Sequence, residues 1–146
     1  EEQLHWLDRT LARFADKPVL VAVHHPPLAT GIAHMDAIGL TDRAALASLV
    51  ARHPQVDLVV AGHVHRQIVG RLAHARVVTI PATAHQVALD LAPDGPPRFV
   101  MEPPAYALHV LTDEGFATHL GYVERHDGPH DFVRAAGVDW PGYPTP

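Results

Sequence analysis

Apolar and polar positions follow different orders in the two halves of this 146-residue chain. In the first half, apolar residues at spacings of three and four predict an amphipathic helix over residues 1–15. Wholly apolar runs rich in valine predict strands buried on both faces at 19–23 and 56–61. A second helical period predicts a helix over 41–53, with Thr41 as its N-cap. Together these elements make a βαβ unit with two parallel strands.

The second half has a pattern that predicts mainly antiparallel strands. Short runs rich in Val, Ile, Leu and Thr alternate there with turn signals. These runs lie at 66–72, 76–80, 83–91, 98–101, 105–111 and 116–123. Residues 28–40 contain two glycines and show no period, which predicts a loop. The sequence therefore predicts an α/β fold over 1–125 and an irregular C-terminal tail over 126–146.

Composition and charge narrow the classes of function. Hydrophobic residues make up 47% of the chain and charged residues 18%, as in a folded domain. The formal net charge is −5, which argues against a nucleic-acid-binding protein. No cluster of basic residues would attract an anionic membrane, and no apolar run approaches the ~20 residues of a membrane span. Cysteine is absent, which excludes disulfides and thiolate metal sites and fits a cytoplasmic location.

Histidines follow both predicted parallel strands directly. His24 and His25 come after the first strand, and His63 and His65 come after the second. Parallel strands bring their carboxyl ends to the same edge of a sheet, where open α/β sheets bind ligands. Imidazole suits Zn, Mn, Fe, Co and Ni, so we expect a metal site of His24, His63 and His65. Gly62 is expected to provide the sharp turn that lets both later histidines point inward.

Each of several other polar residues allows two interpretations of its role. His25 either orients a metal ligand or meets a phosphate. His34 and Asp36 either line a substrate pocket or are ordinary polar residues of a loop. His85 either faces the metals or is a plain strand residue, and Arg66 either meets phosphate or is paired at the surface. The remaining histidines are expected to be solvated or hydrogen-bonded side chains: His5, His53, His74, His109, His119, His126 and His130.

Several motifs together resemble a known family. The segments Leu4-His5-Trp6-Leu7, VAVHHPPL and AGHVHR resemble the C-terminal half of the calcineurin-like metallophosphoesterases. The segments His34-Met35-Asp36, Thr83-Ala84-His85-Gln86-Val87 and Glu102-Pro103-Pro104-Ala105-Tyr106 resemble its bacterial phosphodiesterase branch, which includes glycerophosphodiesterases and class III cyclic-nucleotide phosphodiesterases. The resemblance covers residues 1 to about 125. It implies the C-terminal half of an αββα sandwich, with one βαβ unit followed by mainly antiparallel strands.

The resemblance also implies roles for individual residues. His24 and His63 would bind one metal ion, and His65 would bind its neighbour. His25 would be catalytic. His34, Asp36 and His85 would contact the substrate, a small phosphodiester. The cofactors would be two divalent or trivalent ions of Fe, Mn, Zn or Co, which generate hydroxide and stabilise the attacking and leaving oxygens.

The chain departs from the family pattern in one respect. The family's D-x-H, G-D and G-N-H-[DE] motifs are absent, and no acidic residue is an evident substitute. Three imidazoles alone would hold one ion or none. We therefore expect a fragment of a phosphodiesterase that is inactive alone. The alternatives are a non-catalytic metal-binding or interaction module, and a half-enzyme completed by another chain. A missing half would expose an apolar face and strand edges, which predicts a dimer or swapped oligomer.

Overall fold

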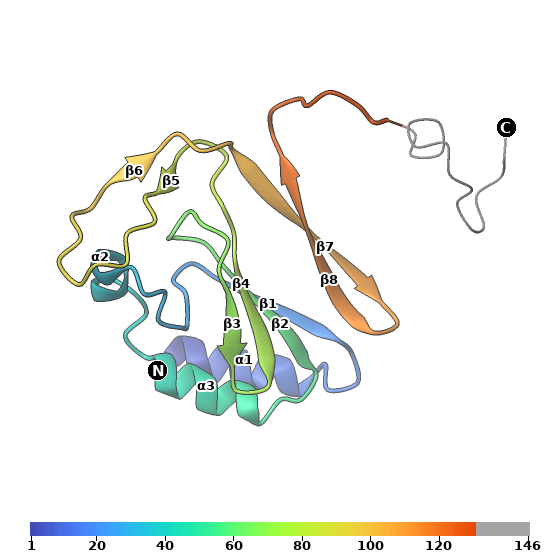
Figure 1. Cartoon of the computed structure of the whole chain (residues 1–146). Helices are drawn as coiled ribbons and strands as arrows, with labels where there is room; N and C mark the ends of the chain where they lie inside the picture. Colours follow the sequence, from blue (N-terminus) through green and yellow to red (C-terminus); the bar gives the residue numbers. More distant parts are fainter. Residues whose placement is uncertain (131–146) are drawn as a thin grey trace, which may run out of the picture.

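A computed structural model describes residues 1–130 of the chain. Its central sheet has the order β1-β2-β4-β3, formed by β1 (Val19–Val23), β2 (Val56–Ala61), β4 (Ala75–Thr79) and β3 (Val69–Leu72) (Figure 1). β1 and β4 both pair with β2 in parallel, and only β3 is antiparallel. The α/β class and the parallel βαβ unit are therefore confirmed. The sequence predicts mainly antiparallel strands after residue 61, and β4 is the exception: it pairs with β3 in antiparallel but extends the parallel part of the sheet through β2.

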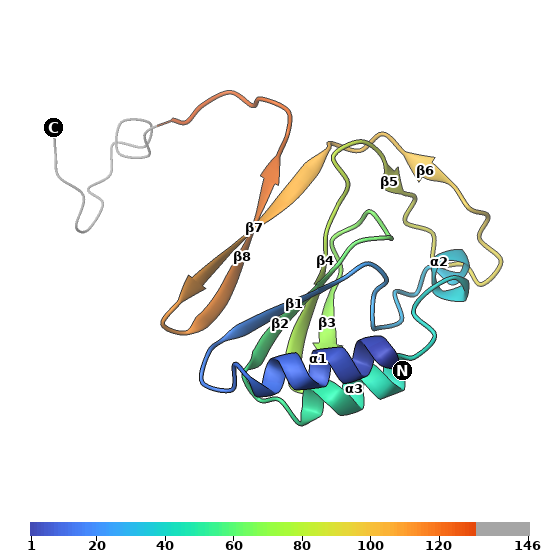
Figure 2. The same ribbon diagram turned by 180° about the vertical axis from the view of Figure 1, so that it is seen from behind.

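Two helices cover one face of this sheet (Figure 2). They are α1 (Glu2–Ala12) and α3 (Arg43–Ala51). Their apolar sides pack on the strands, and Leu11, Leu49, Val59 and Val77 share one buried cluster. Burial of such side chains stabilises a fold by about 1.5–3 kcal/mol each. The main hydrophobic core therefore lies between the sheet and these helices.

The ends of the helices differ from the sequence-based expectations. α1 ends at Ala12, three residues before the expected boundary, and Asp42 rather than Thr41 occupies the N-cap of α3. The Asp42 side chain makes no capping hydrogen bond, so helix α3 begins without the cap that Thr41 was expected to supply. A short helix, α2 (Ala33–Ala37), lies inside the segment predicted to be a loop.

The two parallel strands are not buried alike. β2 lies between β1 and β4, and its residues are buried or half-buried. β1 lies at the edge of the sheet, with Val21 buried towards the helices and Ala22 exposed. The prediction that the first strand is buried on both faces is therefore wrong, because Ala22 is exposed on the face of the sheet opposite the helices.

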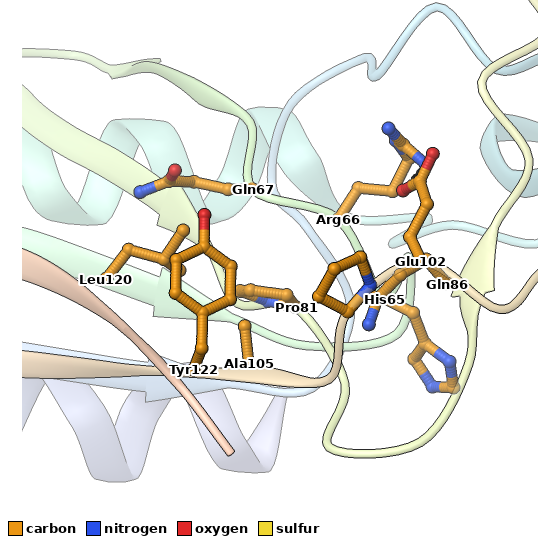
Figure 3. Close-up of a pocket in the computed structure, with 10 residues that line it drawn as sticks. His65, Arg66, Gln67, Pro81, Gln86, Glu102, Ala105, Leu120 and Tyr122 are labelled. Atoms are coloured by element: carbon orange, nitrogen blue, oxygen red, sulfur yellow. Dashed lines mark hydrogen bonds and ion pairs between the residues drawn. The ribbon is translucent and has the colours of Figure 1, made fainter. Parts of the chain in front are cut away.

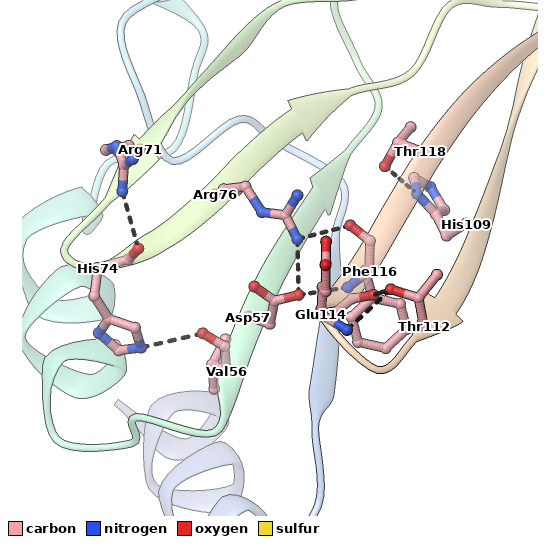
Figure 4. A network of polar contacts seen from close by, with 11 residues as sticks. Val56, Asp57, Arg71, His74, Arg76, His109, Thr112, Glu114, Phe116 and Thr118 are labelled. Atoms are coloured by element: carbon pink, nitrogen blue, oxygen red, sulfur yellow. Dashed lines mark hydrogen bonds and ion pairs between the residues drawn. The ribbon is translucent and has the colours of Figure 1, made fainter.

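A β-bulge at the start of β2 turns Asp57 away from the helices. The register between β1 and β2 shifts by one residue at this point. Because the extra residue breaks the alternation of the strand, Val56 and Val59 both reach the helix-covered core. Asp57 instead accepts hydrogen bonds from Arg76 Nη2 at 2.8 Å and from the backbone N–H of Phe116 at 2.7 Å (Figure 4).

The second half of the described chain forms two antiparallel pairs. β5 (Gln86–Val87) pairs with β6 (Phe99–Val100), and β7 (Ala105–Thr112) pairs with β8 (Gly115–Tyr122). The β7–β8 hairpin extends away from the central sheet (Figure 1). It carries exposed apolar side chains, namely Tyr106, Leu108, Val110, Leu111, Leu120 and Tyr122. The strands expected at 83–91 and 98–101 are shorter than predicted, because β5 and β6 contain two residues each.

The predicted tail is described only in part. Residues 126–130 contain no helix or strand, and the remainder, 131–146, lies outside the described residues. The division at residue 125 stays a prediction. Over residues 1–130, every helix is too short or too polar to cross a membrane.

Candidate functional site

Two loops at the carboxyl edge of the sheet carry the predicted histidines. One follows β1 and the other follows β2, and the backbone N–H of Gly62 donates to the carbonyl oxygen of His24 at 3.1 Å. The N–H of Ile80 donates to Ala61 O at 2.7 Å, which joins the end of β4 to the same edge. These bonds fix the two histidine loops side by side, as the parallel pairing predicts.

His24, His25 and His63 form a compact group. One ring nitrogen of each lies within 4.8 Å of the others. The ring centroids are 4.8 Å apart for His24 and His25, 5.3 Å for His24 and His63, and 4.4 Å for His25 and His63. His24 is exposed and the other two are half-buried. Within residues 1–130, this is the group of potential ligands that lies close enough to hold an ion.

The turn after β2 is made by the histidines and not by Gly62. His63 and His65 have φ angles of 66° and 49°, whereas Gly62 is not in the left-handed region. A hydrogen bond of 2.7 Å from the N–H of Val64 to Gly62 O closes a three-residue turn around His63. Left-handed conformations of residues other than glycine cost about 1–3 kcal/mol and gather at functional sites. The expectation that Gly62 supplies the turn is therefore wrong.

His65 lies in a second group, with His85. Their ring centroids are 4.9 Å apart. The Nδ1 atom of His65 and the Nε2 atom of His63 are both buried without a hydrogen-bond partner. A buried polar atom left unpaired costs about 1–3 kcal/mol, and an unpaired imidazole nitrogen is the donor that a transition metal binds. Both orphaned atoms therefore fit metal ligation.

The charge state of His63 also suits a metal ligand. Burial lowers the pKa of His63, and the neighbouring imidazoles of His25, His24 and His65 lower it further. A lowered pKa keeps the ring neutral at pH 7, so that a nitrogen lone pair is available. Metal ligation requires this neutral form.

Two hollows flank the histidines. One of about 530 Å³ lies between α1 and β1 and opens onto His24 and His25. The other, of about 270 Å³, lies beside His65 and is lined by Gln86, Glu102 and Tyr122 among others (Figure 3). The second hollow lies between the loop that follows β2 and the base of the β7–β8 hairpin.

Arg66 and Gln86 are engaged by neighbouring groups. Arg66 Nη1 donates to Glu102 Oε2 and to Val87 O, both at 2.8 Å. The side-chain amide of Gln86 donates to Ala82 O at 2.8 Å and accepts from Ala82 N–H at 3.1 Å. Of the two readings of Arg66, the structure shows the paired arginine.

Asp36 and His34 lie outside the histidine group. Asp36 Oδ1 accepts hydrogen bonds from Thr30 N–H at 2.8 Å and Thr30 Oγ1 at 2.9 Å, and Oδ2 accepts from Gly31 N–H at 2.9 Å. Burial alone would raise the pKa of Asp36, but these hydrogen bonds and the charge of Arg43 lower it. The carboxylate therefore holds residues 30–36 in place, and the substrate role expected for it and for His34 stays a prediction.

Thr79 was missed by the sequence analysis. It is buried, its hydroxyl donates to Arg66 O, and it accepts a hydrogen bond from Ile68 N–H at 2.8 Å. Because Arg66 follows His65 directly, these bonds fix the segment that carries His65. A signal was available in the sequence, because Thr79 is a polar residue at the end of the apolar run of β4. A hydroxyl at the end of a buried strand can bond to a neighbouring loop.

Known proteins similar to the chain point to one chemistry. A probable glycerophosphodiester phosphodiesterase GpdQ from Arcobacter nitrofigilis is 43% identical over 94% of this chain and 51% of its own length. A probable cyclic nucleotide phosphodiesterase from Rhodopseudomonas palustris is 39% identical over 91% of the chain and 50% of its own length. The chain is a homologue of these glycerophosphodiester and cyclic nucleotide phosphodiesterases.

This phosphodiesterase homologue resembles other relatives over shorter stretches. The 3',5'-cyclic adenosine monophosphate phosphodiesterase CpdA of Escherichia coli is 31% identical over 59% of the chain and 31% of its own length. No family model matches the chain. The chain spans about half the length of the curated relatives it matches. The family resemblance read from its motifs is nevertheless confirmed.

Proposed function

We propose that the protein hydrolyses small phosphodiesters in a metal-dependent reaction. The observation that carries the proposal is the convergence of His24, His25 and His63 at the carboxyl edge of a parallel sheet, in a homologue of phosphodiesterases. In such a reaction water adds to phosphorus and one ester P–O bond breaks. The products are a phosphomonoester and an alcohol, whose oxygen takes up a proton; in a cyclic diester the ring opens and both groups remain in one molecule.

The histidines suit distinct parts of this reaction. We propose that His24 and His63 hold one ion and His65 a neighbouring ion, each of Fe, Mn, Zn or Co. A bound ion supplies a hydroxide at neutral pH and neutralises charge on the phosphate. His25, whose ring lies 4.4 Å from that of His63, is then placed to contact a phosphate oxygen or the departing alcohol.

The hollow beside His65 favours a small alcohol group on the substrate. Its volume of about 270 Å³ lies at the lower end for ligand pockets, which typically hold ~300–1,000 Å³. Gln67 and the Oε1 atom of Glu102 are the polar groups in its lining that could bond to hydroxyl groups, since Glu102 Oε2 is bonded to Arg66 and the amide of Gln86 to Ala82. Glycerophosphodiesters and cyclic nucleotides are the substrate classes named for the relatives, and we propose one of these two classes.

A second candidate function follows from the kind of metal-ligating side chains present. Within residues 1–130, the group around His63 contains imidazoles and no carboxylate, whereas a bridging carboxylate normally holds two cations close together. We propose that catalysis needs carboxylate ligands from the other half of a two-sheet sandwich, and that the 146-residue chain is inactive alone. The alternative is a metal-binding module without catalysis, or a half-enzyme that another chain completes.

One assay separates these functions. Hydrolysis of an activated aryl phosphodiester with added Mn²⁺ is measured for the protein from the whole natural reading frame and for the 146-residue chain. Activity is expected only in the former, with a loss of more than about 100-fold in His63→Ala. His5→Ala, which changes an exposed histidine on α1, is the matched control. Full activity in His63→Ala would refute the assignment, and activity of the shorter chain would refute its dependence on other residues.

A further inference from the structure

We propose that Arg66 is a positioning residue of the phosphodiesterase reaction, and that it acts by holding one segment of the chain against the loop after β2. This segment, called the arm, consists of residues 83–104 and contains β5 and β6. It lies between β4 and β7 in the chain and beside α2 in space (Figure 1). The effect of Arg66 on catalysis rests on the proposed function, whereas its hold on the arm rests on its hydrogen bonds alone.

The arm buries little of its own surface. Its strands β5 and β6 contain two residues each, and an isolated pair of strands is marginally stable at best in water. Within the arm, Gln86 and Val87 are the buried residues. Four large apolar side chains of the arm remain exposed, namely Leu89, Leu91, Phe99 and Met101. Because apolar burial is small, polar contacts have a large share in fixing the position of the arm.

Arg66 binds both strands of the arm through one nitrogen atom. Its Nη1 atom donates to Val87 O, at the end of β5, at 2.8 Å. The same atom donates to Glu102 Oε2, which follows β6, also at 2.8 Å (Figure 3). The Arg66 side chain is 18% exposed, so few water molecules can replace these bonds. Hydrogen bonds of a charged donor to a carboxylate are stronger than bonds between neutral groups. Arg66 therefore ties the outgoing and the returning strand to the loop after β2.

The backbone of Arg66 is itself fixed to the central sheet. Thr79, at the end of β4, donates its hydroxyl to Arg66 O and accepts a hydrogen bond from Ile68 N–H at 2.8 Å. The N–H of Thr79 in turn donates to Ile68 O at 2.9 Å. Thr79 is 0% exposed, so water does not compete for these bonds. Arg66 therefore holds the arm at a fixed place relative to the sheet.

This hold sets the place of His85 beside His65. His65 directly precedes Arg66, and His85 lies two residues before Val87, whose carbonyl oxygen Arg66 binds. The two imidazole centroids are 4.9 Å apart. Val64 and Val87 share a buried cluster, which brings the loop and the arm together without directional bonds. The bonds of Arg66 supply the direction, and a displacement of about 1 Å can cost ~100-fold in rate.

The first measurement follows the arm, in the protein from the whole natural reading frame. Arg66→Ala should accelerate amide hydrogen exchange in residues 83–101 by about 10-fold, with exchange in α3 and β2 unchanged. One reporter is the N–H of Ala88, which donates to Arg98 O at 2.9 Å. Glu102→Ala should have a smaller effect, because the bond from Arg66 to Val87 O remains. The double variant should exchange no faster than Arg66→Ala, since the two side chains act through one contact.

The second measurement follows hydrolysis of an aryl phosphodiester with Mn²⁺ by the same proteins. Arg66→Ala should lower kcat by about 10–100-fold and change KM by less than about threefold, because reacting groups are displaced and not removed. Arg66→Lys keeps a cation with three donors and should recover part of kcat and of the exchange protection. Arg98→Ala is the matched control, since it removes an arginine–carboxylate bond to Asp90 of 2.9 Å that lies wholly within the arm. It should leave kcat unchanged within about twofold.

Three outcomes would contradict the inference. Unchanged exchange of the arm in both Arg66→Ala and Glu102→Ala would mean that apolar contacts hold it. Faster exchange with an unchanged kcat would remove the positioning role, and equally faster exchange in α3 would show a general loss of stability instead. Should Arg66→Ala fail to fold, Glu102→Ala changes an exposed side chain and decides the same question. A wild-type protein that hydrolyses no diester would refute the proposed function and the catalytic role with it, but exchange would still show whether Arg66 holds the arm.

Discussion

The helix-covered side of the central sheet and the β7–β8 hairpin differ in how completely their apolar side chains are buried. Under α1 and α3, Leu49, Val50, Val59 and Val77 are 3%, 0%, 0% and 0% exposed. In the hairpin, Leu108 remains 57% exposed. The chain therefore completes its own core on the helical side, whereas the hairpin leaves apolar side chains in solvent.

This difference shows which part of the chain buries its apolar side chains without a partner. Burial on the helical side involves residues of α1, the βαβ unit and the strands β3 and β4, all within one continuous stretch of sequence. Adjacent exposed apolar side chains, such as those of the hairpin, are typical of a surface that meets a partner. The expected dimer or swapped oligomer would place its contacts there, and it stays a prediction.

Matched leucine substitutions should produce the largest difference between the two regions. Leu49→Ala removes a buried side chain and should lower the free energy of unfolding by about 2–5 kcal/mol. Leu108→Ala removes the same atoms from an exposed position and should change it by less than ~0.5 kcal/mol. Urea denaturation followed by circular dichroism measures both values. Similar losses in the two variants would mean that the hairpin is buried in solution.

The sequence predicts the helical side well because its pattern records burial directly. Apolar residues at helical spacing and two valine-rich runs suffice to identify α1, α3, β1 and β2. The pattern does not record which strand lies at an edge, so the exposure of Ala22 was missed. It also does not record the bulge at Asp57, because a bulge depends on how two strands pair and not on the residues of one.

The same reasoning explains the outcome at the histidines. Because parallel strands bring their carboxyl ends to the same edge of a sheet, the sequence predicted correctly that His24 and His63 lie close together. The separation of His65 from this pair depends on two left-handed backbone conformations and on the packing of Val64. Non-glycine residues rarely adopt such conformations, so a linear motif gives no indication of them.

The attachment of the hairpin to the sheet can be broken at Asp57. Its carboxylate bonds to Arg76 and to the N–H of Phe116, and Arg76 Nη2 also donates to Phe116 O at 2.7 Å. Asp57→Ala should lower the free energy of unfolding by about 1–2 kcal/mol. This loss is smaller than that expected for a buried ion pair, because the Asp57 and Arg76 side chains are partly solvated. Amide hydrogen exchange in β7 and β8 should accelerate, while exchange in α3 changes little.

A control for this variant lies in the same hairpin. Glu114→Gln removes a carboxylate from the exposed turn, next to Gly115, where no side-chain bond of Glu114 is present within residues 1–130. It should leave exchange in β7 and β8 unchanged. Equal protection in Asp57→Ala and Glu114→Gln would show that the hairpin is held by apolar contacts and not by the Asp57–Arg76 pair.

The smallest expected effect tests an electrostatic tie within the helical side. Asp8 on α1 bonds to His53 Nε2 at 2.7 Å and to Arg52 Nη2 at 2.9 Å, just after α3. The hydrogen bond with His53 lowers the pKa of Asp8 below 3.8, and the bond and charge of Arg52 lower it further. A lowered folded pKa means that the stabilisation is complete above the unfolded pKa and is lost as the pH falls through the folded pKa.

The measurable quantity is the difference in unfolding free energy between the wild type and Asp8→Asn. It should shrink as the pH falls below about pH 4, since Asp8 is then increasingly protonated. Asp113→Asn, in the exposed turn of the hairpin, should show no such change. A difference for Asp8→Asn that does not vary with pH would mean that α1 is held by apolar packing alone. The contrast between the two regions would then rest on burial without an electrostatic contribution from this pair.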